Sequence, residues 1–162
     1  MIFEIYTDGS TKNNGYENSV GGWAYSISES GNHIKSKSGA ELNTTNQRME
    51  LTAAIKALEY VMYEIAVPNI DKVIIYTDSA YLHNCYTQKW YVNWKKNGWK
   101  NAKKQPVANQ DLWEKLIQWF ETPEVDFQKV KGHAGNTGNE IVDTLAQKAA
   151  DSLKIVMEAK RC

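Results

Sequence analysis

The alternation of apolar and polar residues predicts three strands at the start of the chain. Residues 2–8, IFEIYTD, alternate and then meet a Gly-Ser pair, which indicates a strand that ends there. Residues 21–28 and 34–42 carry two further strand patterns, and the Ser-Gly-Asn sequence between them is a hairpin signal. We therefore expect the first three strands to form an antiparallel set.

The hydrophobic period lengthens after these strands. From residue 46 to about residue 65, the apolar positions form the stripe of an amphipathic helix, which Pro68 closes. Residues 72–77 are a short, nearly unbroken β-branched run, typical of a strand buried on both faces. The remaining pattern predicts helices at 80–86 and 109–120, a strand at 125–130, a glycine-rich loop, and a last helix from about residue 139.

These elements predict a mixed α/β fold in which helices flank one five-stranded sheet. The length of 162 residues suits one domain. We expect this domain to span residues 1–153, and we expect residues 154–162 to form a C-terminal tail at a frayed helix end.

Composition narrows the class of protein. An apolar content of 42% and an aromatic content of 11% provide enough material for a core and exclude a disordered chain. No run approaches the roughly eighteen apolar residues of a membrane span, and the first residues lack the pattern of a secretory signal. Cys85 and Cys162 do not form a CxxC pair, which argues against a disulfide framework or thiolate metal site. We expect a cytoplasmic protein that acts as a monomer.

The charges balance overall but are unevenly distributed. The chain has 19 basic and 19 acidic residues, yet residues 79–110 contain no Asp or Glu. Lysines with interleaved aromatic residues suit a phosphate backbone and flat bases. A solvated helix face anchored by tryptophans would have the same composition, so both interpretations stay open at this point. The residues in question are Lys89, Lys95, Lys96, Lys100, Lys103 and Lys104, with Trp90, Trp94 and Trp99 between them.

Four carboxylates fall where predicted strands end and predicted helices begin. Asp8 ends the first strand and Asp78 follows the fourth, while Glu50 and Asp143 lie near the starts of the long helix and the last helix. The carboxyl ends of strands are where an α/β sheet gathers ligand groups. If the first and fourth strands are parallel neighbours, Asp8 and Asp78 meet at the same edge.

A cluster of this kind would need cations to neutralise it. Oxygen ligands without His or Cys beside them suit Mg²⁺ or Mn²⁺ and not zinc, and two such ions are a general device for attack on a phosphodiester. Taken singly, each residue also has an ordinary role. Asp8 and Asp78 suit a turn and an N-cap, Glu50 and Asp143 suit the positive end of a helix dipole, and His133 suits an exposed loop.

The joint arrangement of short motifs is more specific than any single residue. In chain order, the motifs are Thr7–Ser10, Thr44–Leu51, Tyr76–Tyr81, Trp94–Trp99, Asn109–Trp113, Val130–Gly135 and Asn139–Asp143. Together they cover about residues 1–150, and in order and spacing they resemble the type 1 ribonuclease H family. The resemblance implies an endonuclease that cuts the RNA strand of RNA/DNA hybrids and leaves 5′-phosphate and 3′-hydroxyl ends.

The resemblance also implies roles for the carboxylates. Asp8, Glu50, Asp78 and Asp143 correspond to the family's metal-binding quartet. The counterpart of Asp8 bridges two Mg²⁺ ions, for which Mn²⁺ can substitute. The Asp143 position belongs with the ion that holds the attacking water, and Glu50 and Asp78 belong with the other ion. His133 matches the histidine that assists proton transfer or product departure.

Further residues match positions where the family contacts its substrate. Asn14, Asn46 and Gln47 fall where the minor groove and the RNA 2′-hydroxyls are contacted, and the loop after Asp8 leaves Asn13 as an alternative to Asn14. Thr45 and Asn93 fall where a phosphate of the DNA strand is held. The basic protrusion that holds this strand corresponds to Trp90, Trp94, Lys95, Lys96, Trp99, Lys100 and Lys103. Rival interpretations are another nuclease on the same fold and a hybrid-binding module without catalysis.

Overall fold

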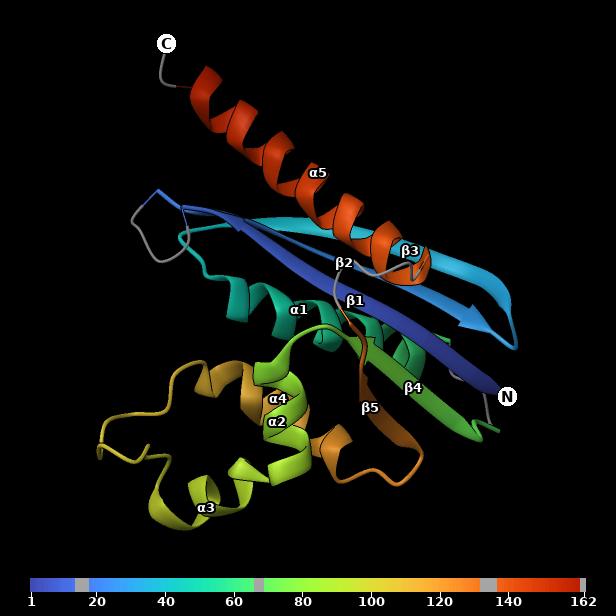
Figure 1. Cartoon of the computed structure of the whole chain (residues 1–162), viewed down its shortest axis with the longest axis vertical. Coiled ribbons are helices and arrows are strands. Elements are labelled where there is room, and N and C mark those ends of the chain that lie inside the picture. The colour runs from blue at the N-terminus through green and yellow to red at the C-terminus, as the bar shows by residue number, and fades with distance from the viewer. Residues whose placement is uncertain (14–17, 66–68, 132–136, 161–162) are drawn as a thin grey trace.

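The computed structural model describes residues 1–13, 18–65, 69–131 and 137–160, and its centre is a five-stranded sheet in the order β3-β2-β1-β4-β5 (Figure 1). The three strands β1, β2 and β3 pair antiparallel, and β4 and β5 extend the sheet in parallel on the other side of β1. The predicted fold class is therefore confirmed. The strands are β1 (Ile2–Lys12), β2 (Val20–Glu29), β3 (Asn32–Leu42), β4 (Lys72–Thr77) and β5 (Val125–Lys129).

The helices lie on both faces of this sheet. Figure 1 shows α5 across one face and α1 across the other, with α2, α3 and α4 grouped beyond α1. The long predicted helix consists of α1 and a π-helical turn, η1. The bounds are α1 (Asn46–Glu59), η1 (Tyr60–Glu64), α2 (Ala80–Gln88), α3 (Trp90–Asn97), α4 (Gln110–Phe120) and α5 (Thr137–Ala159). In the part of the chain that the structure describes, no helix is long and apolar enough to cross a membrane.

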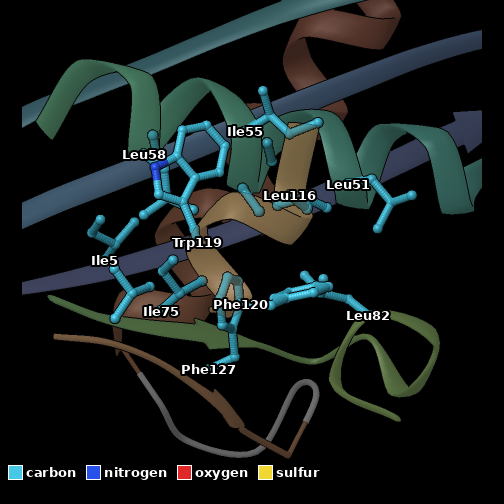
Figure 2. Packing of buried hydrophobic residues seen from close by; sticks show 14 of the residues in the cluster. Ile5, Leu51, Ile55, Leu58, Ile75, Leu82, Leu116, Trp119, Phe120 and Phe127 are labelled. Carbon is cyan, nitrogen blue, oxygen red and sulfur yellow. The ribbon is translucent and has the colours of Figure 1, made fainter. Parts of the chain in front are cut away.

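The main core fills the space between the sheet, α1 and α4. In Figure 2, Leu51, Ile55 and Leu58 lie along α1, with Ile5 and Ile75 of the sheet toward the Leu58 end, and all five belong to the main core. These α1 residues recur at helical spacing, so one face of the helix is buried. From α4, Leu116, Trp119 and Phe120 join the same core, and Figure 2 shows them between α1 and the strands β4 and β5. The core therefore fixes α1, which carries Glu50, against β1, which carries Asp8.

Small residues let α5 approach the opposite face closely. A Cβ atom built on Gly22 of β2 would lie 2.0 Å from the Ala146 carbonyl oxygen, so no larger residue fits there. Ala24, Ala146 and Ala150 are fully buried on this face. This contact sets the depth of α5 against the sheet. It therefore also sets the position of Asp143, which lies about one turn before Ala146.

Two predicted boundaries were wrong in ways that concern the site. The first strand continues past residue 8 to Lys12, because residues 9–12 pair with β2 from Trp23 back to Val20. The last helix begins at Thr137, so Asp143 lies in its second turn and not its first. Glu50 likewise begins the second turn of α1. At its other end α5 runs on through Ala159, so most of the segment predicted as a tail is helical.

Candidate active site and nucleic-acid interface

Asp8 and Asp78 lie side by side because β1 and β4 are parallel neighbours, as expected. The paired part of these strands ends at Tyr6 and Tyr76, and each aspartate follows two residues later. Asp8 is buried, with 6% of its surface exposed, and the Gly9 N–H donates to its Oδ1 at 2.9 Å. The two carboxylates therefore share the carboxyl edge of the parallel strands, where α/β sheets gather ligands.

The sequence places Asp78 and Ser79 at the start of the helix as its N-cap, and the structure assigns the cap to Ser79 and not to Asp78. The N-cap of α2 is Ser79, whose Oγ accepts a hydrogen bond from the Leu82 N–H at 3.0 Å. The Ser79 N–H in turn donates to Thr77 Oγ1 at 3.1 Å. Because Ser79 satisfies the start of the helix, the Asp78 carboxylate is available for another role.

Glu50 reaches the same edge from α1. A Cβ atom on Gly9 would lie 2.6 Å from the Glu50 backbone nitrogen, so the second turn of α1 rests directly on β1 at Gly9. Glu50 is half-buried, and its carboxylate accepts a hydrogen bond from the Ser79 side chain. One serine thus caps α2 and orients Glu50 next to Asp78.

Asp143 completes the group from the opposite face of the sheet. Its side chain lies close enough to Asp8 to raise the pKa of the Asp8 carboxyl. Gln147, one turn further along α5, donates from Nε2 to Asp143 Oδ1 at 3.0 Å. The structure therefore brings Asp8 of β1, Glu50 of α1, Asp78 of the β4–α2 connection and Asp143 of α5 to one edge of the sheet.

The electrostatics of this quartet oppose full ionisation. Burial, the nearby Asp78 charge and the hydrogen bond with Asp143 raise the pKa of Asp8 to about 8, and donation from the Gly9 N–H opposes the rise. Burial also raises the pKa of Glu50, where the hydrogen bond from Ser79 acts against it and the Asp78 charge adds to it. A cation would relieve this repulsion, so the residues present fit a metal site.

The donor chemistry fits hard cations. The quartet offers carboxylate oxygen atoms, the ligands that Mg²⁺ and Mn²⁺ prefer. Within the described ranges, no three acidic, His or Cys side chains converge closely enough to cage one ion. An ion bound here would therefore take further oxygen ligands from water and substrate, as Mg²⁺ commonly does.

In the Lys/Trp segment, the tryptophans pack against the core and the lysines form an exposed surface. Trp94 packs against Trp90, Trp99 and the fully buried Trp113, with ring centroids 5.6–6.1 Å apart, and all three segment tryptophans contact the main core. The lysines Lys95, Lys96, Lys100 and Lys103 are exposed, as is Asn93. Lys95 also pairs with Glu121. The tryptophans thus hold a lysine-rich surface on α3 and the following loop, which we call the protrusion (residues 90–104).

Comparison with known proteins decides the family. The family model described as RNase H matches residues 2–151. The chain belongs to the ribonuclease H family. Among curated ribonucleases H, it is 46% identical over 152 residues to that of Syntrophomonas wolfei, covering 92% of this chain and 96% of the relative. It is 44% identical to that of Dichelobacter nodosus over 153 residues, covering 94% and 95%.

Solved ribonuclease H structures agree on the fold. A type 1 ribonuclease H with the type 2 active-site motif superposes with a TM-score of 0.77 at 27% identity, covering 93% of this chain and 72% of that one. Another ribonuclease H1, solved in complex with an RNA/DNA hybrid, superposes with a TM-score of 0.65 at 22% identity, covering 93% and 98%. The resemblance to type 1 ribonuclease H read from the motifs is confirmed.

Of the other residues predicted to serve a ribonuclease H site, some are exposed and some lie outside the described ranges. Asn46 and Gln47 are exposed in the first turn of α1, behind the cap residue Thr45. Asn14 and His133 lie outside the described residues. The sequence prediction missed two residues that orient carboxylates, Ser79 and Gln147. For Gln147 the signal was its position four residues after Asp143 in a helix.

Proposed function

We propose that this protein is a divalent-metal-dependent endoribonuclease that hydrolyses the RNA strand of RNA/DNA hybrids and leaves 5′-phosphate and 3′-hydroxyl ends. The observation that carries the proposal is the quartet of Asp8, Glu50, Asp78 and Asp143 at one sheet edge, with the pKa of Asp8 raised to about 8. Membership of the ribonuclease H family supports the same reaction.

Mg²⁺ is the proposed cofactor, with Mn²⁺ as a substitute, and the quartet would hold two ions. When bound, such ions neutralise charge at the scissile phosphate and lower the pKa of a bound water. Asp8 would be a ligand to these ions, because its carboxyl interacts with those of both Asp78 and Asp143. The Gly9 N–H, Ser79 and Gln147 each fix one carboxylate, so the ligands are oriented before an ion arrives.

The start of α1 is the proposed contact with the RNA strand. Asn46 and Gln47 are exposed within about one turn of Glu50, and side-chain amides can both donate to and accept from a 2′-hydroxyl. Thr45 Oγ1 accepts from the Arg48 N–H at 3.1 Å, which leaves its hydroxyl hydrogen able to donate to a phosphate. Asn14 is proposed to join the groove contact.

The protrusion is the proposed contact with the DNA strand. Lys95, Lys96, Lys100 and Lys103 supply exposed positive charge, and Asn93 supplies a polar phosphate contact. Trp90, Trp94 and Trp99 hold this surface in place through their ring contacts. Two contact regions, one for each strand, would let the protein select a hybrid by shape.

The remaining assignments are also proposals. His133 is proposed to assist proton transfer or product departure. We propose residues 1–153 as the catalytic domain of a monomeric, cytoplasmic enzyme.

Cleavage of an RNA/DNA hybrid labelled at the RNA 5′ end tests this function. We expect cutting of the RNA strand with Mg²⁺ or Mn²⁺, no cutting with a chelator, and no cutting of RNA/RNA or DNA/DNA duplexes. Asp8→Asn should lower the rate by at least about a thousandfold. Asp126→Asn removes a half-buried carboxylate of β5 that lies outside the quartet, so it should keep the rate. Tight binding without cutting would indicate a hybrid-binding module, and cutting of DNA would indicate a different nuclease.

A further inference from the structure

The motif Asn109–Trp113, which has no assigned role, meets the start of α1 through a single arginine. Arg48, on α1, donates from Nη1 to Asp111 Oδ1 at 3.0 Å and from Nη2 to Asp111 Oδ2 at 2.9 Å. Its Nη1 also donates to Asn109 Oδ1 at 3.2 Å. Asn109 and Asp111 form the start of α4, so the guanidinium joins the first turn of α1 to the first turn of α4. A bidentate arginine–carboxylate pair fixes the relative orientation of its two side chains as well as the distance between them.

The connection continues from α4 into α2. The Tyr81 hydroxyl accepts from Asn109 Nδ2 at 3.2 Å and from Trp113 Nε1 at 3.1 Å. Tyr81 belongs to α2 and follows Asp78 by three residues. Its ring contacts Trp113 at 5.0 Å and Trp90, the first residue of the protrusion, at 6.2 Å. Continuous contacts thus run from the start of α1 to the protrusion.

The Arg48–Asp111 pair, called the bridge below, is partly exposed, which limits its effect on stability. The side chains of Arg48 and Asp111 are 32% and 64% exposed, so solvent screens the pair, although its bidentate geometry makes it stronger than a single contact. The bridge restricts the position of α4 relative to the start of α1. Arg48 directly follows Asn46 and Gln47, the proposed RNA contacts, and Asp111 lies on the helix whose Trp113 packs against Trp94.

We propose that Arg48 and Asp111 are positioning residues that set the spacing between the RNA contact on α1 and the DNA contact on the protrusion. The inference rests on the proposed function, because it assumes that one duplex touches both regions. Duplexes differ in groove width and in the distance between strands. A fixed spacing therefore selects the duplex whose two strands reach both regions together.

Two substrates distinguish positioning from a structural role. One hybrid is long enough to reach from the quartet to the protrusion, and the other is truncated on the protrusion side. For Asp111→Asn and Arg48→Gln, we expect KM on the long hybrid to rise about fivefold, with kcat nearly unchanged and KM on the short hybrid unaffected. The double variant should be no worse than either single variant, and Asp111→Glu should recover part of the loss.

Asp71→Asn is the matched control, because it removes an exposed ion pair with the Met1 amino group before β4, at the opposite end of that strand from Asp78. It should leave KM on both hybrids unchanged. An equal rise in KM on both hybrids, or no rise in Asp111→Asn and Arg48→Gln, would overturn the proposal. If the unaltered chain bound hybrids without cutting, the proposed function would fail. The ratio of long-hybrid to short-hybrid affinity in the variants would then still decide whether the bridge positions the two contacts.

Discussion

Asp8 is the most buried residue of the quartet, and its burial determines how its contribution to stability changes with pH. Its pKa is raised from 3.8 to about 8, so in the folded protein it stays protonated at a pH where the unfolded chain has already lost the proton. The contribution of Asp8 to stability is therefore fully present below about pH 4. It falls as the pH rises toward 8, by at most about 1.4 kcal/mol per pH unit.

A pH series of melting temperatures tests this effect. In chelator, the unaltered chain should lose stability relative to Asp8→Asn between pH 5 and pH 8, because asparagine does not titrate. Added Mg²⁺ or Mn²⁺ should raise the melting temperature of the unaltered chain more at pH 8 than at pH 5, since the cation favours the ionised carboxylate. A difference between the two proteins that stayed constant with pH would contradict the raised pKa.

Between elements, a buried serine joins the two loops that lead to the proposed RNA contacts. Ser19 Oγ donates to the Thr44 carbonyl oxygen and accepts from the Thr44 N–H, both at 2.8 Å. The Asn43 N–H donates to the Ser19 carbonyl oxygen, also at 2.8 Å. Ser19 precedes β2 and Thr44 precedes the cap of α1, so these hydrogen bonds hold the two connections together at one end of the sheet.

Ser19→Ala should leave the buried Thr44 N–H and carbonyl oxygen without these partners. We expect a loss of about 1–3 kcal/mol in the free energy of unfolding, measured by urea denaturation. KM for the hybrid should rise, because Thr45, Asn46 and Gln47 follow directly. Ser38→Ala on the exposed edge strand β3 is the control and should change neither quantity. An unchanged urea midpoint in Ser19→Ala would show that water replaces the serine.

The sequence predicted the strands and helices better than their ends, because the ends depend on contacts between distant segments. The Gly-Ser pair after Asp8 was interpreted as a strand end, but Gly9 is required there because α1 lies against β1. Local pattern does not encode such a contact. The meeting of Asp8 with Asp78 followed from the parallel-strand hypothesis and is confirmed. The Arg48–Asp111 bridge joins residues 63 positions apart, and nothing in either segment alone indicates the other.

At the scale of the molecule, the formal net charge of zero means that binding must depend on local charge. Replacing Lys95, Lys96, Lys100 and Lys103 with Ala should weaken hybrid affinity and reduce the slope of log affinity against log salt by up to about 3. The matched control replaces four lysines outside the protrusion, Lys35, Lys37, Lys56 and Lys115, and so changes net charge equally. If the slope of log affinity against log salt fell equally in both variants, the protrusion would have no special role in binding.

The gathering of the quartet from distant segments has a consequence for biosynthesis. The four carboxylates extend from residue 8 to residue 143, and the last of them arrives only when α5 packs onto the sheet. Asp8, Glu50 and Asp78 are synthesised before Asp143, because synthesis proceeds from the N-terminus. The strands and helices that carry the first three carboxylates can therefore begin to fold before the fourth exists. The quartet is complete only after α5 has been made and has packed onto the sheet.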